Sequence, residues 1–192
     1  MANPDSTWLK SLERLVQEHL GAVYPTGEAV KVSAELELAS GFQVSDYTSK
    51  GARHKIIFNQ ADLVVLDEGP HGKWKPRVAM ECRQGELSSR EVLAANARAE
   101  QFKLVQPYLR FGLLIGRFEG LSLPYRVLKH GPHFDFVVAW EGPTPKGMTR
   151  DRLGAIIVAE IDASRALSSL LLKEGTAAMG PIRMLHRPLT LA

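Results

Sequence analysis

The sequence predicts an α/β fold, with a mixed central β-sheet flanked by helices. Three observations predict it: an amphipathic helical pattern near the N-terminus, several apolar or alternating segments typical of strands, and a second helical pattern between two of those segments. The chain has 192 residues, of which 45% are hydrophobic, so it is long enough to bury a core of its own. We therefore expect a single domain over residues 1–192.

The first helix is predicted to begin near residue 6 and to end near residue 20. Asp5-Ser6-Thr7 offers an N-cap, and Gly21 is a typical stop. Between them, apolar residues recur at helical spacing: Leu9, Leu12, Val16 and Leu20. Glu13 shares a helix side with two of these residues, so we expect its carboxylate beside the apolar stripe.

Extended segments follow this helix. Residues 29–39 alternate apolar and polar side chains, which is typical of a half-exposed strand, and residues 54–67 form a longer extended stretch. Residues 61–87, "ADLVVLDEGPHGKWKPRVAMECRQGEL", contain the apolar runs LVVL and VAM, joined by a Gly-, Pro- and Lys-rich connection. This pattern predicts a β-hairpin, with Asp67 and Glu68 as turn residues.

The order of elements defines a core and an extension. A helix capped by Ser88 or Ser89 is predicted over residues 88–106, followed by a buried strand at residues 111–118. The core over residues 6–118 is therefore helix, three strands, helix, strand. The extension over residues 119–192 is predicted to be β-rich and helical, and its predicted elements are strands at 134–140 and 155–161 and a helix at 163–175.

Two acids mark the hairpin as a candidate site. Asp62 opens the first apolar run, and Glu81 closes the second, with Cys82 and Arg83 after it. Paired strands lie about 5 Å apart, so acids at facing positions can converge on one cation. Mg²⁺ favours a few carboxylates together with water and substrate phosphate oxygens. Residues 81 and 83 share a strand face, so the arginine can reach the same place and stabilise charge on a phosphate.

This arrangement resembles the PD-(D/E)XK, or restriction endonuclease-like, nuclease superfamily. The superfamily has an Asp on one core strand and a Glu-x-Lys on the next, followed by a helix and a strand. Asp62 matches the Asp, Glu81 the Glu and Cys82 the variable residue, and the resemblance covers about residues 6–118. It implies an αβββαβ core and a Mg²⁺- or Mn²⁺-dependent nuclease that hydrolyses phosphodiester bonds, namely a DNA endonuclease of restriction, defence or repair type.

The resemblance also implies roles for individual residues. Asp62, Glu81 and the backbone carbonyl of Cys82 would hold the metal, with Glu13 as a candidate for a further ligand. Arg83 stands where the motif has lysine, and arginine keeps the positive charge but does not readily act as a general base. An alternative therefore stays open: a nuclease-fold protein with weakened catalysis that serves as a nucleic-acid-binding or assembly module.

Simpler interpretations remain beside these. Asp62 can be a strand-start residue that accepts backbone hydrogen bonds, and Glu81 with Arg83 can be a surface ion pair. The chain would then be an α/β protein with another function altogether.

Two further residues are candidates under the nuclease hypothesis. Lys55 is a candidate for a relocated catalytic lysine, and Gln101 is a candidate for contact with the active site.

Composition sets limits on partners and location. The net charge of +3 permits contact with phosphates without requiring it. No apolar run approaches the roughly 20 residues that span a bilayer, and the N-terminus is too polar for a secretory signal. With a single cysteine, the simplest expectation is a cytoplasmic protein, and no membrane partner is expected. The resemblance implies DNA as the partner. The resemblance also implies a homodimer, and the Leu-rich stretch at residues 166–172 either forms its interface or packs on the chain's own sheet.

Overall fold

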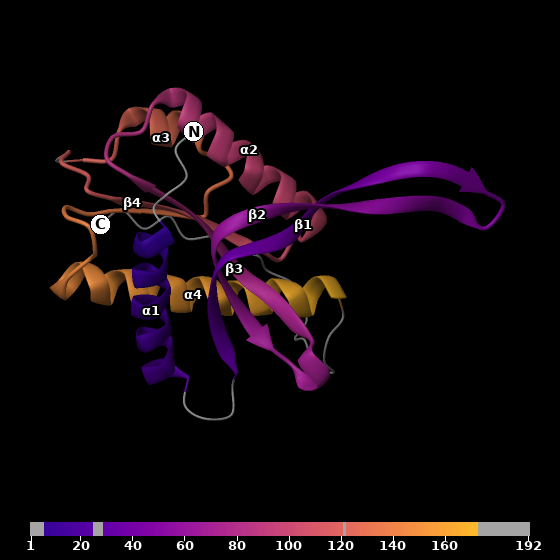
Figure 1. Ribbon diagram of the computed structural model, residues 1–192, viewed down its shortest axis with the longest axis horizontal. Coiled ribbons are helices and arrows are strands. Elements are labelled where there is room, and N and C mark those ends of the chain that lie inside the picture. Colours follow the sequence, from indigo (N-terminus) through magenta and orange to yellow (C-terminus); the bar gives the residue numbers. More distant parts are fainter. Residues whose placement is uncertain (1–5, 25–28, 121, 173–192) are drawn as a thin grey trace, which may run out of the picture.

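The computed structural model describes residues 6–24, 29–120 and 122–172. It confirms the α/β class, with a five-stranded mixed sheet flanked by helices (Figure 1). The strands lie in the order β1-β2-β3-β4-β5, with β1, β2 and β3 antiparallel and β3, β4 and β5 parallel. Their bounds are β1 (Val30–Thr48), β2 (Gly51–Glu68), β3 (Trp74–Gln84), β4 (Arg110–Gly116) and β5 (Phe136–Ala139).

Helices cover both faces of the sheet. On one face, α1 and α4 pack against apolar side chains of β2 and β3, and on the other face α2 and α3 cover β3 and β4. The helices are α1 (Ser6–Val23), α2 (Ser89–Val105), α3 (Tyr125–His130) and α4 (Gly147–Leu172), and a 3₁₀ turn, η1 (Pro70–Gly72), joins β2 to β3. In the described part of the chain, no helix is both long and apolar enough to cross a membrane.

The two predicted helices of the core form where the patterns placed them. In α1 the buried stripe includes Leu9, Leu12, Val16 and Leu20, as predicted. This helix continues past Gly21 to Val23, and the cap residue Asp5 lies outside the described residues. In α2 the predicted cap is Ser88, which accepts a hydrogen bond from the Glu91 backbone while the Glu91 carboxylate accepts one from the Ser88 backbone.

The predicted hairpin is confirmed, and its register positions the candidate site. Leu63 of β2 pairs with Met80 of β3 in an antiparallel ladder. One step beyond that pair the strands present Asp62 and Glu81, so the two acids are neighbours across the hairpin. The prediction for Asp67 and Glu68 was wrong, because both residues lie within β2 rather than in the turn.

The prediction for the extension was wrong in its β content. In its described residues, β5 is the only strand, and the expected strand at residues 155–161 belongs to the continuous helix α4. The run AIIVAEI is rich in β-branched residues, but Leu153, Ile157 and Ile161 recur every four residues and bury one helix side against the sheet. Tertiary packing therefore outweighs the local preference for a strand.

The first two strands extend far beyond the rest of the sheet. Strand β1 has 19 residues and β2 has 18, whereas β4 has only 7. Their distal halves pair with each other from Gly41–Ile57 to Thr48–Gly51 and form a two-stranded ribbon that projects from the body (Figure 1). We call residues 41–57 the arm.

Candidate functional site

Asp62 and Glu81 converge on one guanidinium group. One terminal nitrogen of Arg83 (Nη1) donates to Asp62 Oδ2 at 3.0 Å and to the Cys82 carbonyl oxygen at 2.7 Å. Its other terminal nitrogen donates to Glu81 Oε1. Asp62 Oδ2 also accepts a hydrogen bond from the Cys82 backbone N–H at 2.8 Å. The two predicted acids, the Cys82 carbonyl and Arg83 therefore form one buried cluster.

A second arginine joins the cluster from the helix above it. Arg98 of α2 donates to the same Glu81 oxygen that accepts from Arg83. The capping box at Ser88 fixes the start of this helix, which sets where Arg98 reaches the sheet. The sequence patterns described above did not single out this arginine. Its position on the helix that follows the Glu-x-Arg strand is the signal that could have found it.

Burial changes the titration of this cluster. Only 1% of Glu81 is exposed, and burial together with the neighbouring Asp62 carboxylate raises the pKa of Glu81, although Arg83 and Arg98 act in the opposite direction. Burial and the two acids also raise the pKa of the Cys82 thiol well above its usual value. Cys82 packs with the apolar core on the other face of β3, so its side chain is a small hydrophobe rather than a nucleophile.

The oxygens of the cluster fit a hard divalent cation. Carboxylate and carbonyl oxygens are the ligands that Mg²⁺ and Mn²⁺ prefer. The three groups that accept hydrogen bonds from Arg83 are two carboxylates and one carbonyl. Arg83 donates to all three groups, so it would compete with a cation for these oxygens. The donor set therefore fits the metal, and Arg83 competes with it.

Other candidate residues lie away from the cluster. Glu13 is on α1, which covers the opposite face of the sheet from Arg98 and α2. Across the residues that the structure describes, no three His, Cys, Asp or Glu side chains are arranged to hold a metal ion. Lys55 lies on the exposed arm opposite Gln43, and Gln101 bonds Asn59 rather than either acid. None of the three is brought to the acid pair.

A second, partly buried arginine cluster lies further along the same two strands. Asp67 accepts hydrogen bonds from Arg77 of β3 at 2.7 Å and from Arg165 of α4 at 2.9 Å. Burial by itself would raise the pKa of Asp67, but the hydrogen bonds from Arg165 and Arg77 lower it below its usual value. We call these three residues the Asp67 cluster; it ties α4 to the hairpin.

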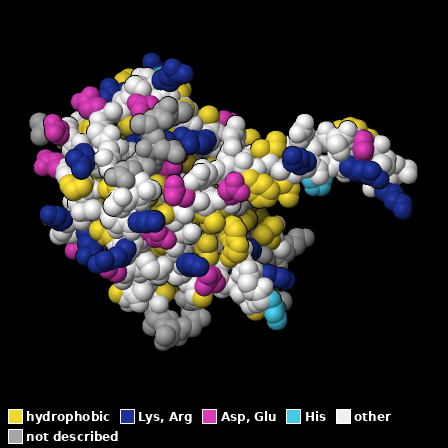
Figure 2. All heavy atoms as spheres, viewed as in Figure 1, with side chains coloured by type: hydrophobic (Ala, Val, Ile, Leu, Met, Phe, Trp, Pro, Cys, Tyr) yellow, Lys and Arg dark blue, Asp and Glu magenta, His cyan; other side chains and the backbone are white. Residues whose placement is uncertain are grey.

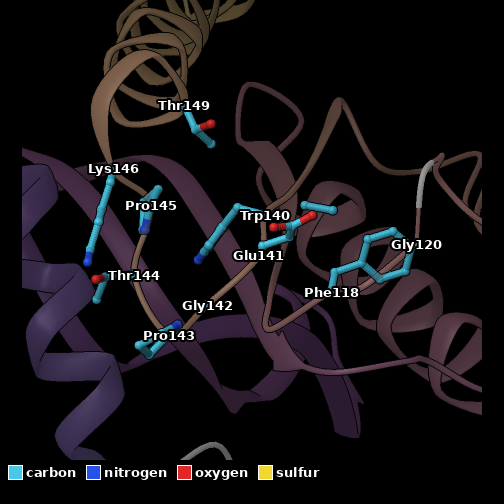
Figure 3. A pocket seen from close by; sticks show the side chains of 11 residues that line it. Phe118, Gly120, Trp140, Glu141, Gly142, Pro143, Thr144, Pro145, Lys146 and Thr149 are labelled. Atoms are coloured by element: carbon cyan, nitrogen blue, oxygen red, sulfur yellow. The ribbon is translucent and has the colours of Figure 1, made fainter.

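A hollow in the described structure lies elsewhere. A cavity of about 630 Å³ lies between the end of β5 and the start of α4 (Figure 3). Its lining includes Trp140, Lys146 and Thr149, and among the described residues the indole N–H of Trp140 finds no hydrogen-bond partner. Asp62 and Glu81 are not among the lining residues, so this cavity is separate from the candidate site.

Comparison with known proteins adds no assignment to this geometry. A scan against protein-family models finds no matching family, and a search of curated proteins finds no matching sequence.

Proposed function

We propose that this protein is a metal-dependent nuclease of the PD-(D/E)XK type that hydrolyses phosphodiester bonds in DNA, acting in the cytoplasm. The observation that carries the proposal is the convergence of Asp62, Glu81 and the Cys82 carbonyl on one cationic group. These are the three ligands that the resemblance implies, and here they already surround a positive charge. A surface ion pair would not need three buried acceptors.

The order and pairing of the elements support the same proposal. In the described core the chain runs α1, β1, β2, β3, α2, β4, which is the order that the resemblance implies. The Asp is on β2, the Glu is on β3, and the helix that follows contributes a cation to the Glu. This placement of the acids, on neighbouring strands beside a helix, supports the proposal.

In this proposal some residues of the cluster would hold the ion and others would bind the phosphate. Asp62, Glu81 and the Cys82 carbonyl would hold Mg²⁺ or Mn²⁺, and the bound ion would supply a Lewis acid that polarises the phosphodiester. Arg83, displaced from the acids, can bind a phosphate oxygen through its planar fork of donors. Arg98 can add a second positive charge beside the developing charge on phosphorus.

A second candidate function rests on Arg83 itself. In the structure this arginine satisfies both acids, and Arg98 donates to Glu81 as well, so the cluster already holds two positive charges for its two negative ones. If the guanidinium remains there when DNA is present, it acts as a built-in cation in place of the metal. The protein would then be a nucleic-acid-binding or assembly module with a nuclease-like fold.

Cleavage of plasmid DNA with Mn²⁺ tests the two candidates. We expect the wild type to cut, Glu81→Ala to lose on the order of a hundredfold or more in rate, and Arg83→Lys to keep or raise activity. Glu86→Ala is the matched control, because Glu86 is five residues further along and 80% of its side chain is exposed. It should cut like the wild type.

The outcomes separate the candidates cleanly. A wild type that stays inert while Arg83→Lys cuts would favour the binding module, with catalysis blocked by the arginine. Glu81→Ala cutting as fast as the wild type would remove the acid pair from the mechanism. If neither the wild type nor Arg83→Lys cuts DNA, the nuclease proposal fails, and a gel-shift assay with the same DNA then tests binding alone.

A further inference from the structure

The two faces of the arm differ in chemistry. Residues paired directly across an antiparallel ladder point to the same face, and the faces alternate along each strand. The pairs Phe42–Ile56, Val44–His54 and Tyr47–Ala52 therefore share one face, and the continuous alternation of β2 adds Phe58 to it. The edge contact between the rings of Phe42 and His54, at 5.4 Å, agrees with this assignment.

The opposite face of the arm is polar. It carries the pairs Gln43–Lys55 and Asp46–Arg53, with Gly41–Ile57 at its root. The charged side chains of the two paired segments are thus confined to one side of the ribbon. The apolar face has no charged Asp, Glu, Lys or Arg among the residues named above.

Within the described chain, the apolar face of the arm is exposed. Its large side chains are between 41% and 81% exposed, namely Phe42, Val44, Tyr47, Ile56 and Phe58. Figure 2 shows hydrophobic side chains gathered where the arm leaves the body. An isolated two-stranded ribbon is marginally stable in water, so an arm of this length with an apolar face needs a surface to pack against.

We propose that the apolar face of the arm is an interface with a second copy of this chain, formed by the arms of two protomers packing face to face. In a two-fold symmetric contact each copy contributes the same face, so one apolar surface would meet another. Stacked ribbons lie about 10 Å apart, which is the ordinary spacing of packed sheets. The polar faces, with Lys55 and Arg53, would then remain on the outside of the pair.

The exposed area of this face would supply a large part of a protein interface. With aromatic side chains of roughly 150–250 Å² each, the five exposed residues present roughly 500 Å². A stable interface takes about 800 Å² from each partner, so the arm would supply more than half of it. The net charge of +3 per chain is small enough that two copies repel only weakly at physiological salt.

Nucleic acid is a poorer occupant of this face. Phosphates are bound by Lys and Arg, and on the arm the strand cations lie on the polar side, where Arg53 is already 3.9 Å from Asp46. DNA bound there would leave the apolar face in water. The proposal concerns a surface separate from the acid pair, and its test reads mass rather than cleavage, so it stands or fails independently of the nuclease function.

Sedimentation equilibrium without nucleic acid, at micromolar protein, tests the proposal. We expect the wild type at twice the chain mass of 21.2 kDa and the variant Phe42→Thr/Ile56→Thr at the single mass. Gln43→Thr/Lys55→Thr is the matched control, because this pair is the next one along the ribbon and points to the other face. Threonine favours strands, so both variants keep the ribbon.

A shortened variant tests whether a monomeric result could come from an unfolded arm rather than from loss of the apolar face. Replacing residues 42–56 by an Asn-Gly turn joins Gly41 to its partner Ile57 and removes most of the apolar face. This variant should unfold cooperatively and sediment as a monomer. A monomeric wild type, a dimeric Phe42→Thr/Ile56→Thr variant, or a wild type that pairs only when duplex DNA is added would each overturn the proposal.

Discussion

Two clusters of carboxylates and arginines lie on the same hairpin and differ in their balance of charge. In the Asp67 cluster one acid accepts from two arginines, and its pKa is lowered. At the other end of the shared ladder, Asp62 and Glu81 face each other, and the pKa of Glu81 is raised. The first cluster stabilises the charged form of Asp67, whereas the surroundings of Glu81 disfavour its charged form.

The difference comes from deeper burial and from the second acid. Asp67 has no neighbouring carboxylate in its cluster, so its burial is offset by the hydrogen bonds that it accepts. Glu81 is deeper in the protein and has the Asp62 charge beside it, so even two arginines do not restore its usual pKa. Stability alone does not require two buried acids at one place. Such a pair is typical of a site selected for binding a cation or for catalysis.

The largest effect on stability is expected from a substitution that breaks the Asp67 cluster. Asp67→Asn removes the charge that holds Arg77 and Arg165, and leaves the buried Arg77 guanidinium without its ionic acceptor. Breaking a largely buried ion pair in this way costs about 3 kcal/mol, so urea unfolding should show a clear loss of stability. Asp46→Asn on the exposed arm is the control and should change stability by less than about 0.5 kcal/mol. Equal effects would mean that the Asp67 cluster contributes no more than a surface pair.

A smaller effect on stability is expected from metal binding, which should depend on Glu81 and not on Asp67. Mn²⁺ at ten times its dissociation constant should raise the free energy of unfolding of the wild type by about 1.4 kcal/mol. Glu81→Gln should abolish this gain, whereas Asp67→Asn should keep it despite its lower starting stability. Glu86→Gln serves as the control for a nearby exposed acid. A wild type that Mn²⁺ does not stabilise would favour Arg83 as the permanent cation of the cluster.

The smallest expected effect is the dependence of stability on pH, which has opposite signs in the two clusters. The folded-state pKa of Glu81 is above its usual 4.5, so its contribution is present below that pH and is lost as pH rises through the folded value. The folded-state pKa of Asp67 is below its usual 3.8, so its contribution is present above that pH and is lost as pH falls through the folded value.

Unfolding at a series of pH values measures both slopes. The stability of Glu81→Gln relative to the wild type should increase from about pH 4.5 towards neutral pH, because the variant carries no buried charge at this position. The deficit of Asp67→Asn should instead shrink as the solution is acidified below about pH 3.8. Parallel curves for Glu81→Gln and the wild type would show that the arginines fully compensate the burial of Glu81.

The sequence alone determined the elements of the core and the pairing of the acids. Helical spacing identified α1 and α2, and the two apolar runs around a Gly- and Pro-rich turn identified the β2–β3 hairpin. The apolar runs favour the register in which Asp62 and Glu81 are neighbours, and the ladder reaches it through a register shift between Val65 and Leu66. These features depend on contacts that are close along the chain, and a local pattern is sufficient to predict them.

The tertiary structure decided the environment of each charge. Arg83 could equally have pointed to solvent, and Arg98 reaches Glu81 only because α2 lies over that face of the sheet. The run at residues 155–161 was predicted to be a strand, yet it is helical because α4 packs lengthwise on the sheet and presents Arg165 to Asp67. Contacts between elements far apart in sequence depend on packing and burial, which residue spacing does not encode. Only the folded chain therefore shows that one hairpin carries two charge clusters of opposite character.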